Sequence, residues 1–338
     1  MRGAGVLMKK LKIGQIGIGH NHAEAKMATV RKFPEVFDVV GVAEPDPAWR
    51  EKRGDLPGYR DLPFLPVEEL LNTPGLDALL IESDVKDLTR YARLAIDRGF
   101  PIHMDKPGGE DYGEFRDLME EARQKNLPVQ LAYMYRYNPA VRYILEKQRS
   151  GELGKILHID AHMSTEHSDE YRQWLTQFPG SSMYIFGCHL IDLIVLLQGE
   201  PERIIPFFHQ SGKNGVACFD NNAAVLEYPQ GPSFVRVSST EVNGYGRRQF
   251  VVCGTKMTVE IKPFEYPTVM TVSRAGTDNI YADHRETVEL PPITGRYDEE
   301  MLDFARIVAG EKENPFSYDH ELRIHRATLR ACGVSISG

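Results

Sequence analysis

Cysteine and tryptophan are scarce in this chain, whose 338 residues include four cysteines and two tryptophans. The cysteines lie far apart and form no Cys-x-x-Cys pair, so we expect free thiols in a reducing compartment and neither a disulfide framework nor a zinc site. Long apolar runs are missing too. The most apolar stretch, 185–197, is interrupted by His189 and Asp192, whereas a membrane-spanning helix needs about 20 apolar residues.

An excess of basic residues is also missing, because 40 Lys and Arg stand against 48 Asp and Glu, for a formal net charge of −8. This balance argues against nucleic acid and anionic membranes as partners. Residues 1–10 contain no apolar run of signal-peptide length, so the sequence favours a cytoplasmic protein. The length indicates roughly two domains with a substantial buried core.

The first third of the chain alternates short apolar strands with helices. Strands are predicted at 12–16, 37–43, 78–81, 101–104 and 128–134, and helices at 20–32, 67–71, 87–98 and 112–125. This alternation predicts an α/β domain with a parallel sheet and right-handed crossovers.

From residue 156 onward, strands follow one another and helices are set apart. Strands are predicted at 156–163, 204–210, 223–228, 234–239, 248–253, 257–261, 269–273 and 287–290, with helices at 187–197, 299–309 and 319–332. Consecutive strands of this kind predict an α+β domain with a large, mostly antiparallel sheet. One face of such a sheet needs a cover, which self-association into a homo-oligomer would supply.

A glycine turn, Gly17-Ile18-Gly19, joins the first strand to the first helix. Such a turn is typical of a dinucleotide pyrophosphate site, although His22 stands at the third glycine position and a tight turn without a ligand is the alternative. Glu44 ends the second strand, where a carboxylate accepts both hydroxyls of the adenosine ribose and repels a 2′-phosphate. The two features together favour NAD over NADP.

With these and later motifs in the same order, the chain resembles the glucose–fructose oxidoreductase/inositol dehydrogenase (Gfo/Idh/MocA) family over nearly its whole length. The motifs are Gly17-Ile18-Gly19 with Glu44, Asp105-Lys106-Pro107, Tyr135-Arg136-Tyr137-Asn138-Pro139, Gly151-Glu152-Leu153-Gly154-Lys155 and Gly187-Cys188-His189-Leu190-Ile191-Asp192. The resemblance implies NAD(P)-dependent oxidation or reduction of sugars, inositols and related polyols. It also implies an N-terminal Rossmann domain and a C-terminal open sheet that often forms oligomer contacts.

We therefore predict a Rossmann domain over 1–136, with the C-terminal helix 317–338 packing back on it. A substrate and oligomerisation domain is predicted over 137–316, in a dimer or tetramer. The cofactor residues are predicted to be Gly17, Ile18, Gly19, His20, Asn21, His22, Glu44, Ser83, Asp105, Lys106 and Pro107. The substrate residues are predicted to be Tyr135, Arg136, Trp174 in a polar loop at 171–180, Tyr184 and Asp192.

Lys106 and His189 are the predicted catalytic residues. Lys106 ends a parallel strand, where such sheets place ligands, and the resemblance implies that it contacts the reacting hydroxyl and the nicotinamide ribose. His189 is the predicted proton acceptor, because imidazole titrates near neutral pH. A surface lysine and a core histidine paired with Asp192 are the alternatives. The geometric expectation is that the two side chains meet over the bound nicotinamide.

Two departures from the family pattern affect this prediction. Ile185 stands where the family commonly has an aspartate, and Tyr184, Glu166, His167 and Asp169 are candidates to replace it. Glu82-Ser83-Asp84 follows the third strand, where the family often has Thr-Pro and Asn, so this neighbourhood is more acidic than usual.

Alternation along the strand 156–163 places His158, Asp160 and His162 on one face. Three such side chains can bind a metal, but a polar sheet face or a subunit contact is far commoner, and no metal is predicted.

Three functions remain open at this point. The first is an NAD-dependent dehydrogenase of a small carbohydrate or polyol. The second is an NAD-dependent glycosidase that acts by transient oxidation and elimination. The third is a non-catalytic NAD-binding protein, because a fold does not determine a function.

Overall fold

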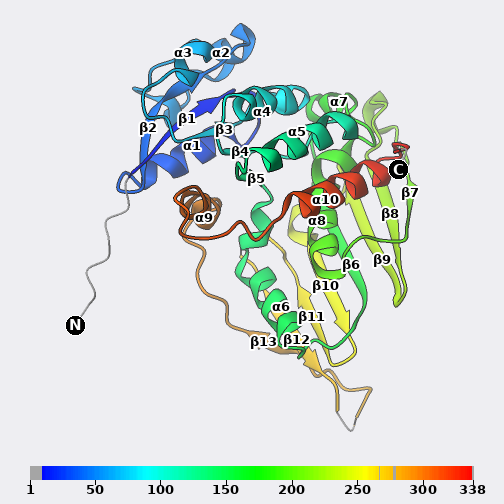
Figure 1. Ribbon diagram of the computed structural model, residues 1–338. Coiled ribbons are helices and arrows are strands. Elements are labelled where there is room, and N and C mark those ends of the chain that lie inside the picture. The colour runs from blue at the N-terminus through cyan, green and yellow to red at the C-terminus, as the bar shows by residue number, and fades with distance from the viewer. Residues whose placement is uncertain (1–9, 266, 277–278, 337–338) are drawn as a thin grey trace, which may run out of the picture. The chain divides into compact units, whose positions relative to one another are not determined.

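The computed structural model describes residues 10–265, 267–276 and 279–336 (Figure 1). The segment 1–9, on which most of the prediction of no signal peptide rests, lies outside the described residues. The chain divides into two compact units. The first unit contains the chain up to Met134 and the segment Thr294–Leu322, and the second contains Tyr135–Ile293 and the segment from Arg323 onward.

The first unit contains a five-stranded sheet of order β2-β1-β3-β4-β5 in which all neighbours are parallel. Its strands are β1 (Leu11–Ile16), β2 (Phe37–Ala43), β3 (Ala78–Ile81), β4 (Ile102–Met104) and β5 (Val129–Leu131). Its helices are α1 (Ala23–Lys32), α2 (Pro47–Arg53), α3 (Val67–Leu71), α4 (Leu88–Asp97), α5 (Tyr112–Gln124) and α9 (Asp298–Val308), with short 3₁₀ turns η1 (Pro57–Tyr59) and η2 (Val85–Asp87). The strand order reverses at β1, and ligands of such sheets bind beyond the carboxyl ends of the strands at that point.

Burial explains why the strands of the first unit read as continuous apolar runs. All four residues of β3 are buried, as expected for a central parallel strand covered on both faces. Helix α4 is amphipathic and buries Leu88, Ala92 and Ile96. The α/β fold class predicted for this part of the chain is thereby confirmed.

The second unit contains an eight-stranded sheet of order β13-β12-β11-β10-β6-β9-β8-β7. Its strands are β6 (Ile156–Ser164), β7 (Arg203–Phe207), β8 (Asn221–Tyr228), β9 (Gly231–Ser238), β10 (Gln249–Gly254), β11 (Met257–Ile261), β12 (Met270–Arg274) and β13 (Glu286–Val288). Among the described strand pairs of this eight-stranded sheet, only β6–β9 is parallel. The prediction of a large, mostly antiparallel sheet is confirmed.

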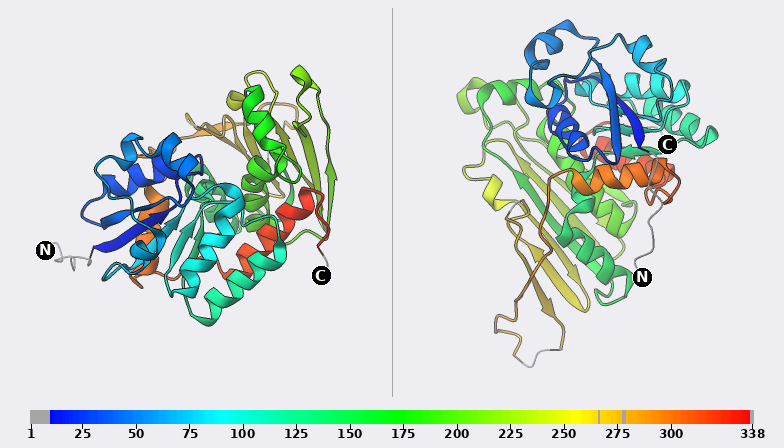
Figure 2. Two further views of the ribbon diagram at one scale, coloured as in Figure 1. Left: turned by 90° about the horizontal axis from the view of Figure 1, so that it is seen from above. Right: turned by 90° about the vertical axis from the view of Figure 1, so that its left-hand side faces the viewer.

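Helix α8 covers one face of this sheet, against β6 and β9 (Figures 1 and 2). The helices of the unit are α6 (Pro139–Arg149), α7 (Asp169–Leu175), α8 (Cys188–Gln198) and the later part of α10 (Tyr318–Ala331). Shorter turns are η3 (Met134–Tyr137), a π-helical turn η4 (Met183–Gly187), η5 (Lys213–Gly215) and η6 (Tyr245–Arg247). Burial alternates strictly along β8, so the second face of the sheet is half-exposed.

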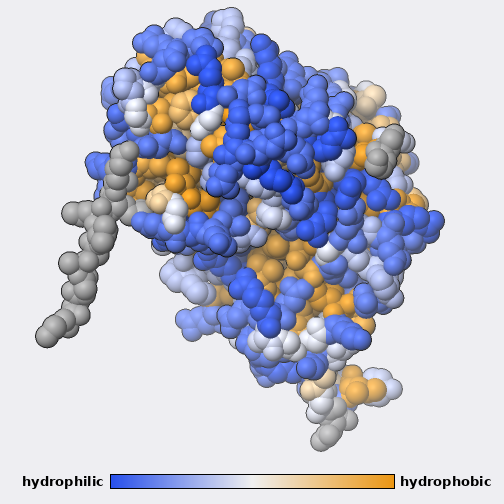
Figure 3. Space-filling model, in the orientation of Figure 1, coloured by the Kyte–Doolittle hydropathy of each residue, from blue (hydrophilic) through white to orange (hydrophobic). Residues whose placement is uncertain are grey.

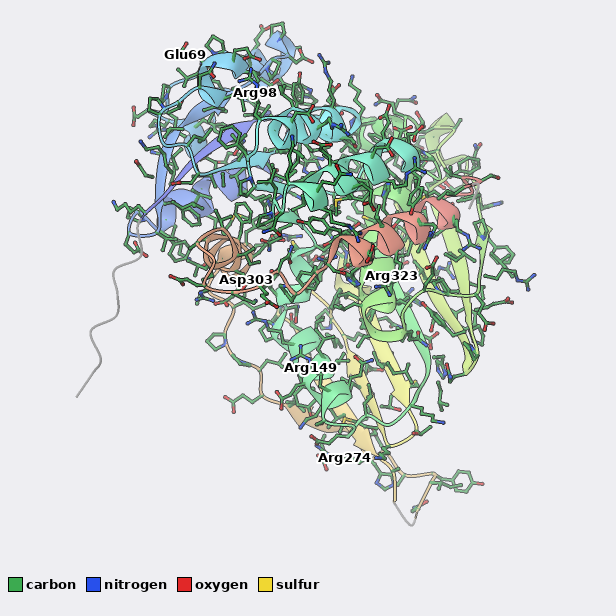
Figure 4. The ribbon with its side chains drawn as sticks, in the orientation of Figure 1. Glu69, Arg98, Arg149, Arg274, Asp303 and Arg323 are labelled. Atoms are coloured by element: carbon green, nitrogen blue, oxygen red, sulfur yellow. The ribbon has the colours of Figure 1, made fainter. Side chains whose placement is uncertain are left out.

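The β12–β13 hairpin ends in exposed side chains. Arg274 on β12 forms an ion pair with Glu286 on β13, and the arginine is labelled in Figure 4. Beyond this pair, Ile280 is 77% exposed and Tyr281 is 93% exposed. Figure 3 shows apolar surface at this tip.

The division of the chain differs from the predicted domains near the C-terminus. Residues 294–316 belong to the first unit, and residues 323–336 belong to the second. Helix α9 belongs with the first unit because it packs on α1, where Asp298 pairs with Lys32, and because Phe304 lies against the ring of His103. On the same helix, Asp303 binds Lys312 (Figure 4).

Some local predictions were wrong. The strand predicted at 128–134 ends at Leu131, and the chain turns into η3. The loop predicted at 171–180 begins as helix α7, because the hydroxyl of Ser168 accepts the backbone N–H of Tyr171 and caps the helix. Trp174 therefore lies on a helix and not in a loop.

Helices α2 and α6 were also not predicted, although each begins with a capping residue followed by proline. Asp46 and Pro47 begin α2, and Asn138 and Pro139 begin α6. Among the residues that the structure describes, no helix has the length and apolar character needed to cross a membrane.

Candidate active site

Gly17 and Gly19 form the tight turn between β1 and α1. Gly17 has φ +87°, and a Cβ atom there would lie 2.2 Å from Cα of Ser83. A Cβ on Gly19 would lie 2.6 Å from the backbone N of Asp84. Both positions therefore require glycine, one for its backbone conformation and both for the close approach of the segment after β3.

Glu44 and Arg53 fix the shape of this turn. The Glu44 carboxylate accepts the backbone N–H of Ile18 at 2.5 Å and that of Asp46 at 2.8 Å. Burial raises the pKa of Glu44, although these two N–H groups oppose the shift. Arg53 donates to the carbonyl oxygens of Ile18, Gly19 and His20 at 3.2, 2.9 and 2.6 Å, and to Oδ1 of Asn21 at 2.7 Å.

Asp105, after β4, lies close to three side-chain nitrogen atoms. Its Oδ2 atom lies 2.9 Å from Nδ1 of His20, 3.3 Å from Nδ1 of His22 and 2.5 Å from Nζ of Lys26. Its Oδ1 atom accepts the backbone N–H of Lys106 at 2.7 Å. Burial alone would raise the pKa of Asp105, but His20 and Lys26 hold it well below its usual range.

Lys26 joins Asp105 to a second buried carboxylate. Its ammonium also binds Oε1 of Glu82 at 2.8 Å, and all three side chains are fully buried. Burial lowers the pKa of Lys26, but Asp105 and Glu82 outweigh that effect and raise it. Burial raises the pKa of Glu82 well above its ordinary value, so Glu82 stays protonated to higher pH while Asp105 stays ionised.

The buried network continues along the sheet to α9. The Nδ1 atom of His103 lies 3.9 Å from Oε1 of Glu82, and its Nε2 atom lies 3.6 Å from Oε1 of Glu300. Burial and the charge of Lys26 lower the pKa of His103, so this imidazole is neutral. Among the described residues, neither carboxylate oxygen of Glu300 has a hydrogen-bond partner.

The side chains of His20, His22 and Asp105 lie close enough together to bind a metal ion. However, the ammonium of Lys26 lies at the same Asp105 oxygen that a metal would need. Burial lowers the pKa of His22 to about 3 and also lowers that of His20, and the carboxylate beside them already has a cation. The donor set fits a charge network better than a metal centre.

Lys106 is the predicted catalytic residue of the first unit. It is 2% exposed and directly follows Asp105 in the sequence. The Lys106–Pro107 peptide bond is cis. The structure brings the carboxyl ends of β1, β3 and β4 together through the strand order, so the glycine turn, Ser83 and Lys106 lie at one edge of the parallel sheet.

His189 lies in the second unit at the start of α8 and is 5% exposed. The ring of Tyr135 meets the His189 ring edge-on, with centroids 5.0 Å apart and an interplanar angle of 85°. One helical turn along α8, Asp192 is bound by Arg136, whose Nε and Nη2 donate to the carboxylate at 3.0 and 2.7 Å. Arg136 and Asp192 thus form a buried bidentate pair.

Two of the aromatic candidates, Tyr184 and Trp174, pack against the same ring, that of Phe178. Tyr184 is fully buried and stacks on Phe178, with centroids 5.8 Å apart. Trp174 is half-buried and meets Phe178 at 4.8 Å and Tyr171 at 5.1 Å. Trp174 is the most exposed of the three aromatic residues predicted to contact the substrate, since Tyr135 and Tyr184 are both buried. It is therefore better placed than Tyr184 to contact a ligand.

Residues 141–260 match the model of the GFO/IDH/MocA C-terminal domain. This segment therefore contains the C-terminal domain of the Gfo/Idh/MocA family. The resemblance on which the expected fold rested is thereby confirmed.

Curated proteins that resemble this chain over more than half of its length include named dehydrogenases. The chain is 25% identical to trans-1,2-dihydrobenzene-1,2-diol dehydrogenase of Bos taurus, over 68% of this chain and 65% of that protein. It is 26% identical to D-xylose 1-dehydrogenase (NADP(+)) 2 of Haloferax volcanii, over 71% of this chain and 72% of that protein. Two further curated relatives are matched over only 54% and 56% of their length.

Among solved structures, UDP-N-acetylglucosamine 3-dehydrogenase of Acidithiobacillus ferrooxidans superimposes with a TM-score of 0.77 at 18% identity, covering 96% of this chain and 97% of that one. This likeness shows the shared fold.

Ile185, which stands where the resemblance implies an aspartate, is buried in η4. Two of its candidate substitutes have other partners, since Glu166 binds Lys213 at 2.8 Å and Asp169 binds Arg172 at 2.6 Å. His167 lies between the rings of Tyr171 and Phe186, with centroids 4.4 and 5.0 Å away. Burial and the charge of Arg248 lower the pKa of His167 to about 4.

His158, Asp160 and His162 lie half-exposed on one face of β6, as the alternation predicts. Nε2 of His158 lies 3.8 Å from Oδ2 of Asp160. The geometry is that of a polar sheet face.

Several residues of these sites were missed by the sequence analysis. In the first unit they are Lys26, Arg53, His103 and Glu300, and in the second they are Arg248 and Glu265. A signal for Lys26 was present, because it lies on the same face of α1 as the buried Ala23, Met27 and Val30. A lysine within such an apolar stripe indicates a buried ion pair.

Proposed function

We propose that this chain is an NAD-dependent oxidoreductase that transfers a hydride between nicotinamide and a sugar, an inositol or a related polyol. The observation that carries the proposal is the placement of Lys106 and the glycine turn at one edge of the parallel sheet, beside the strand-end Glu44. Two relatives support the substrate class, since one is named a D-xylose dehydrogenase and the other a dihydrodiol dehydrogenase.

The residues of the first unit fit a dinucleotide. His22 is the N-cap of α1 and makes no side-chain capping bond, so the first-turn N–H groups of α1 suit a pyrophosphate. Each oxygen of Glu44 accepts one backbone N–H and retains capacity to accept a ribose hydroxyl. The negative charge of Glu44 disfavours a 2′-phosphate, which supports NAD rather than NADP.

Bound nicotinamide would supply the hydride acceptor or donor. Residues of the chain would stabilise the reacting oxygen and accept the proton of the hydroxyl group. Lys106 is buried, so its ammonium acts in a medium of low dielectric constant and stabilises negative charge on the reacting oxygen. The hydrogen bond from the Lys106 backbone to Asp105 fixes the strand end that carries this side chain. We assign His189 as the group that accepts the hydroxyl proton, because a neutral imidazole is a base of suitable pKa.

The remaining substrate residues are assigned to the second unit. Arg136 and Asp192 form a buried pair there, and Tyr135, Tyr184 and Trp174 supply aromatic faces of the kind that suit a sugar ring. The half-exposed face of the eight-stranded sheet is proposed as the contact of a homo-oligomer, since exposed sheet faces with residues such as Phe234 and Leu157 favour association.

A turnover assay tests this proposal. The protein is incubated with NAD and a panel of sugars, inositols and polyols, and formation of NADH is followed. We expect turnover with at least one member, and we expect Lys106→Met to lower kcat/KM by on the order of 10³-fold. Lys125→Met is the matched control, because Lys125 is exposed and binds carbonyl groups at the end of α4.

Retention of full turnover by Lys106→Met contradicts the assigned role of this lysine. Cleavage of a chromogenic glycoside that requires NAD but yields no net NADH contradicts net hydride transfer and indicates redox-neutral elimination. Binding of NAD without any reaction on the panel contradicts the enzymatic proposal as a whole.

A further inference from the structure

Tyr135 is the aromatic neighbour of His189 within the second unit. Besides the edge-on contact with His189, its ring stacks on Phe264, with centroids 4.6 Å apart and an interplanar angle of 24°. Phe264 in turn stacks on Phe250 of β10, with centroids 5.9 Å apart. The tyrosine ring is 3% exposed and is thus held on both sides by rings.

The hydroxyl of Tyr135 binds the carboxylate of Glu265, which is 7% exposed. The same Oε1 atom of Glu265 accepts Nη1 of Arg248 at 2.7 Å. Arg248 also donates to the carbonyl of Ser164 at 3.2 Å and to the hydroxyl of Thr165 at 2.5 Å. The carboxylate is therefore fixed by β6 and by the start of β10, and it fixes the phenol.

Asp192 follows His189 by three residues, and Ile185 precedes it by four. Asp192, on the same helix as His189, is bound through both oxygens by Arg136. Ile185, in the preceding η4 turn, carries no charge that could act on an imidazole. The carboxylate of Glu265 reaches His189 through one intervening residue, Tyr135.

We infer that Tyr135 and Glu265 are positioning residues for His189, and that they take the place of the aspartate that this chain lacks at Ile185. The role of His189 as a proton acceptor rests on the proposed function, but the positioning itself does not. The phenol, anchored by Glu265, fixes the plane of the imidazole. The anchored carboxylate places negative charge one residue away from the ring, where it favours the protonated imidazole.

Titration of His189 by nuclear magnetic resonance tests this inference without any substrate. The chain has 11 histidines, so the signal of His189 is assigned from its loss in His189→Asn. We expect Glu265→Gln to lower the midpoint of the His189 titration by about 0.5 pH unit or more, because a negative charge is lost and the Arg248 guanidinium is left unpaired. We expect Tyr135→Phe to broaden or split the His189 signal, since the ring remains but its anchor is lost.

Asp220→Asn is the matched control. Asp220 is also a buried carboxylate of the second unit, bound by Arg172 at 3.0 Å. We expect this variant to leave the His189 titration unchanged. Chemical shifts of the remaining histidines report whether each variant is folded, and Glu265→Asp is expected to restore part of the wild-type midpoint.

An unchanged His189 signal in both Glu265→Gln and Tyr135→Phe overturns the inference. Equal shifts in those variants and in Asp220→Asn overturn it too, because they indicate a general loss of packing. If the wild-type protein shows no turnover but the titration responds as expected, the proposed function fails and the positioning stands. Where turnover is measurable, the acidic limb of the kcat/KM profile is expected to move with the titration midpoint.

Discussion

In the first unit two buried side chains bind the same oxygen of Asp105, whereas in the second unit the buried carboxylate of Asp192 is bound by the guanidinium of Arg136. His20 and Lys26 converge on one oxygen of Asp105. Asp192, by contrast, is bound face to face by Arg136. A shared network ties the strand-end residues into one electrostatic unit, so its loss is expected to reach every member. Loss of the Arg136 guanidinium is expected to act first on Asp192.

The largest expected effect follows from breaking the shared network at Lys26. Lys26→Met leaves the carboxylates of Glu82 and Asp105 buried without their common cation. We expect the free energy of unfolding to fall by about 3–5 kcal/mol at neutral pH. Chemical denaturation followed by circular dichroism measures the change, and the deficit should shrink in acid as the carboxylates become protonated.

The free energy of unfolding of Arg136→Met is measured in the same way and compared with that of Lys26→Met. One carboxylate loses a guanidinium in this variant, whereas Lys26→Met removes the cation of two, so we expect a loss in the free energy of unfolding no larger than that of Lys26→Met. Arg203→Met is the control, because Arg203 pairs with Glu227 at the surface, with 63% of the arginine side chain exposed, and such pairs add little to stability. A loss for Arg203→Met as large as that for Lys26→Met would show that burial is not the cause.

Glycine substitution separates backbone strain from close packing in the first unit. Gly17 and Gly99 have nearly the same backbone, with φ +87° and +86°, but a Cβ atom on Gly99 meets no heavy atom within 4 Å. We expect Gly99→Ala to cost about 1 kcal/mol in the free energy of unfolding. Gly17→Ala is expected to cost at least about 2 kcal/mol more, because a new Cβ would collide with Ser83. Equal costs for the two variants would mean that the turn yields to the added methyl group.

The last expected effect concerns stability in acid. The pKa of His167 is lowered from 6.5 to about 4 in the folded chain, so the unfolded chain binds the proton more readily. The stabilisation by the neutral ring is complete above pH 6.5 and is lost as the pH falls toward 4. His167→Phe keeps a ring between Tyr171 and Phe186 but cannot be protonated. We expect its free energy of unfolding to fall less steeply over this interval, and an unchanged slope would contradict the assignment.

Local motifs account for what could be predicted about the first unit. The turn at Gly17 and the strand ends at Glu44 and Lys106 are short sequence signals, and the parallel topology then brings strand ends to one edge. The fold class of both units follows from the order of strands and helices along the chain. Pairing of residues distant in the sequence is not available from such patterns.

The second unit shows why the rest could not be predicted. Tyr135 and Glu265 are 130 positions apart, and Arg136 and Asp192 are 56 apart. These contacts depend on the register of the eight-stranded sheet and on the turn after β11, which no local motif specifies. The loop predicted around Trp174 failed for a simpler reason, because the capping serine before α7 was overlooked.

Binding of the dinucleotide to the wild-type chain tests whether the glycine turn and Glu44 form an NAD site. Isothermal titration calorimetry is performed with NAD and with NADP, and repeated with Glu44→Ser. The account predicts that NAD binds, that NADP binds at least about tenfold more weakly, and that Glu44→Ser narrows the difference. Absence of binding heat for both dinucleotides over a range of temperatures, or tighter binding of NADP by the wild-type chain, would contradict it.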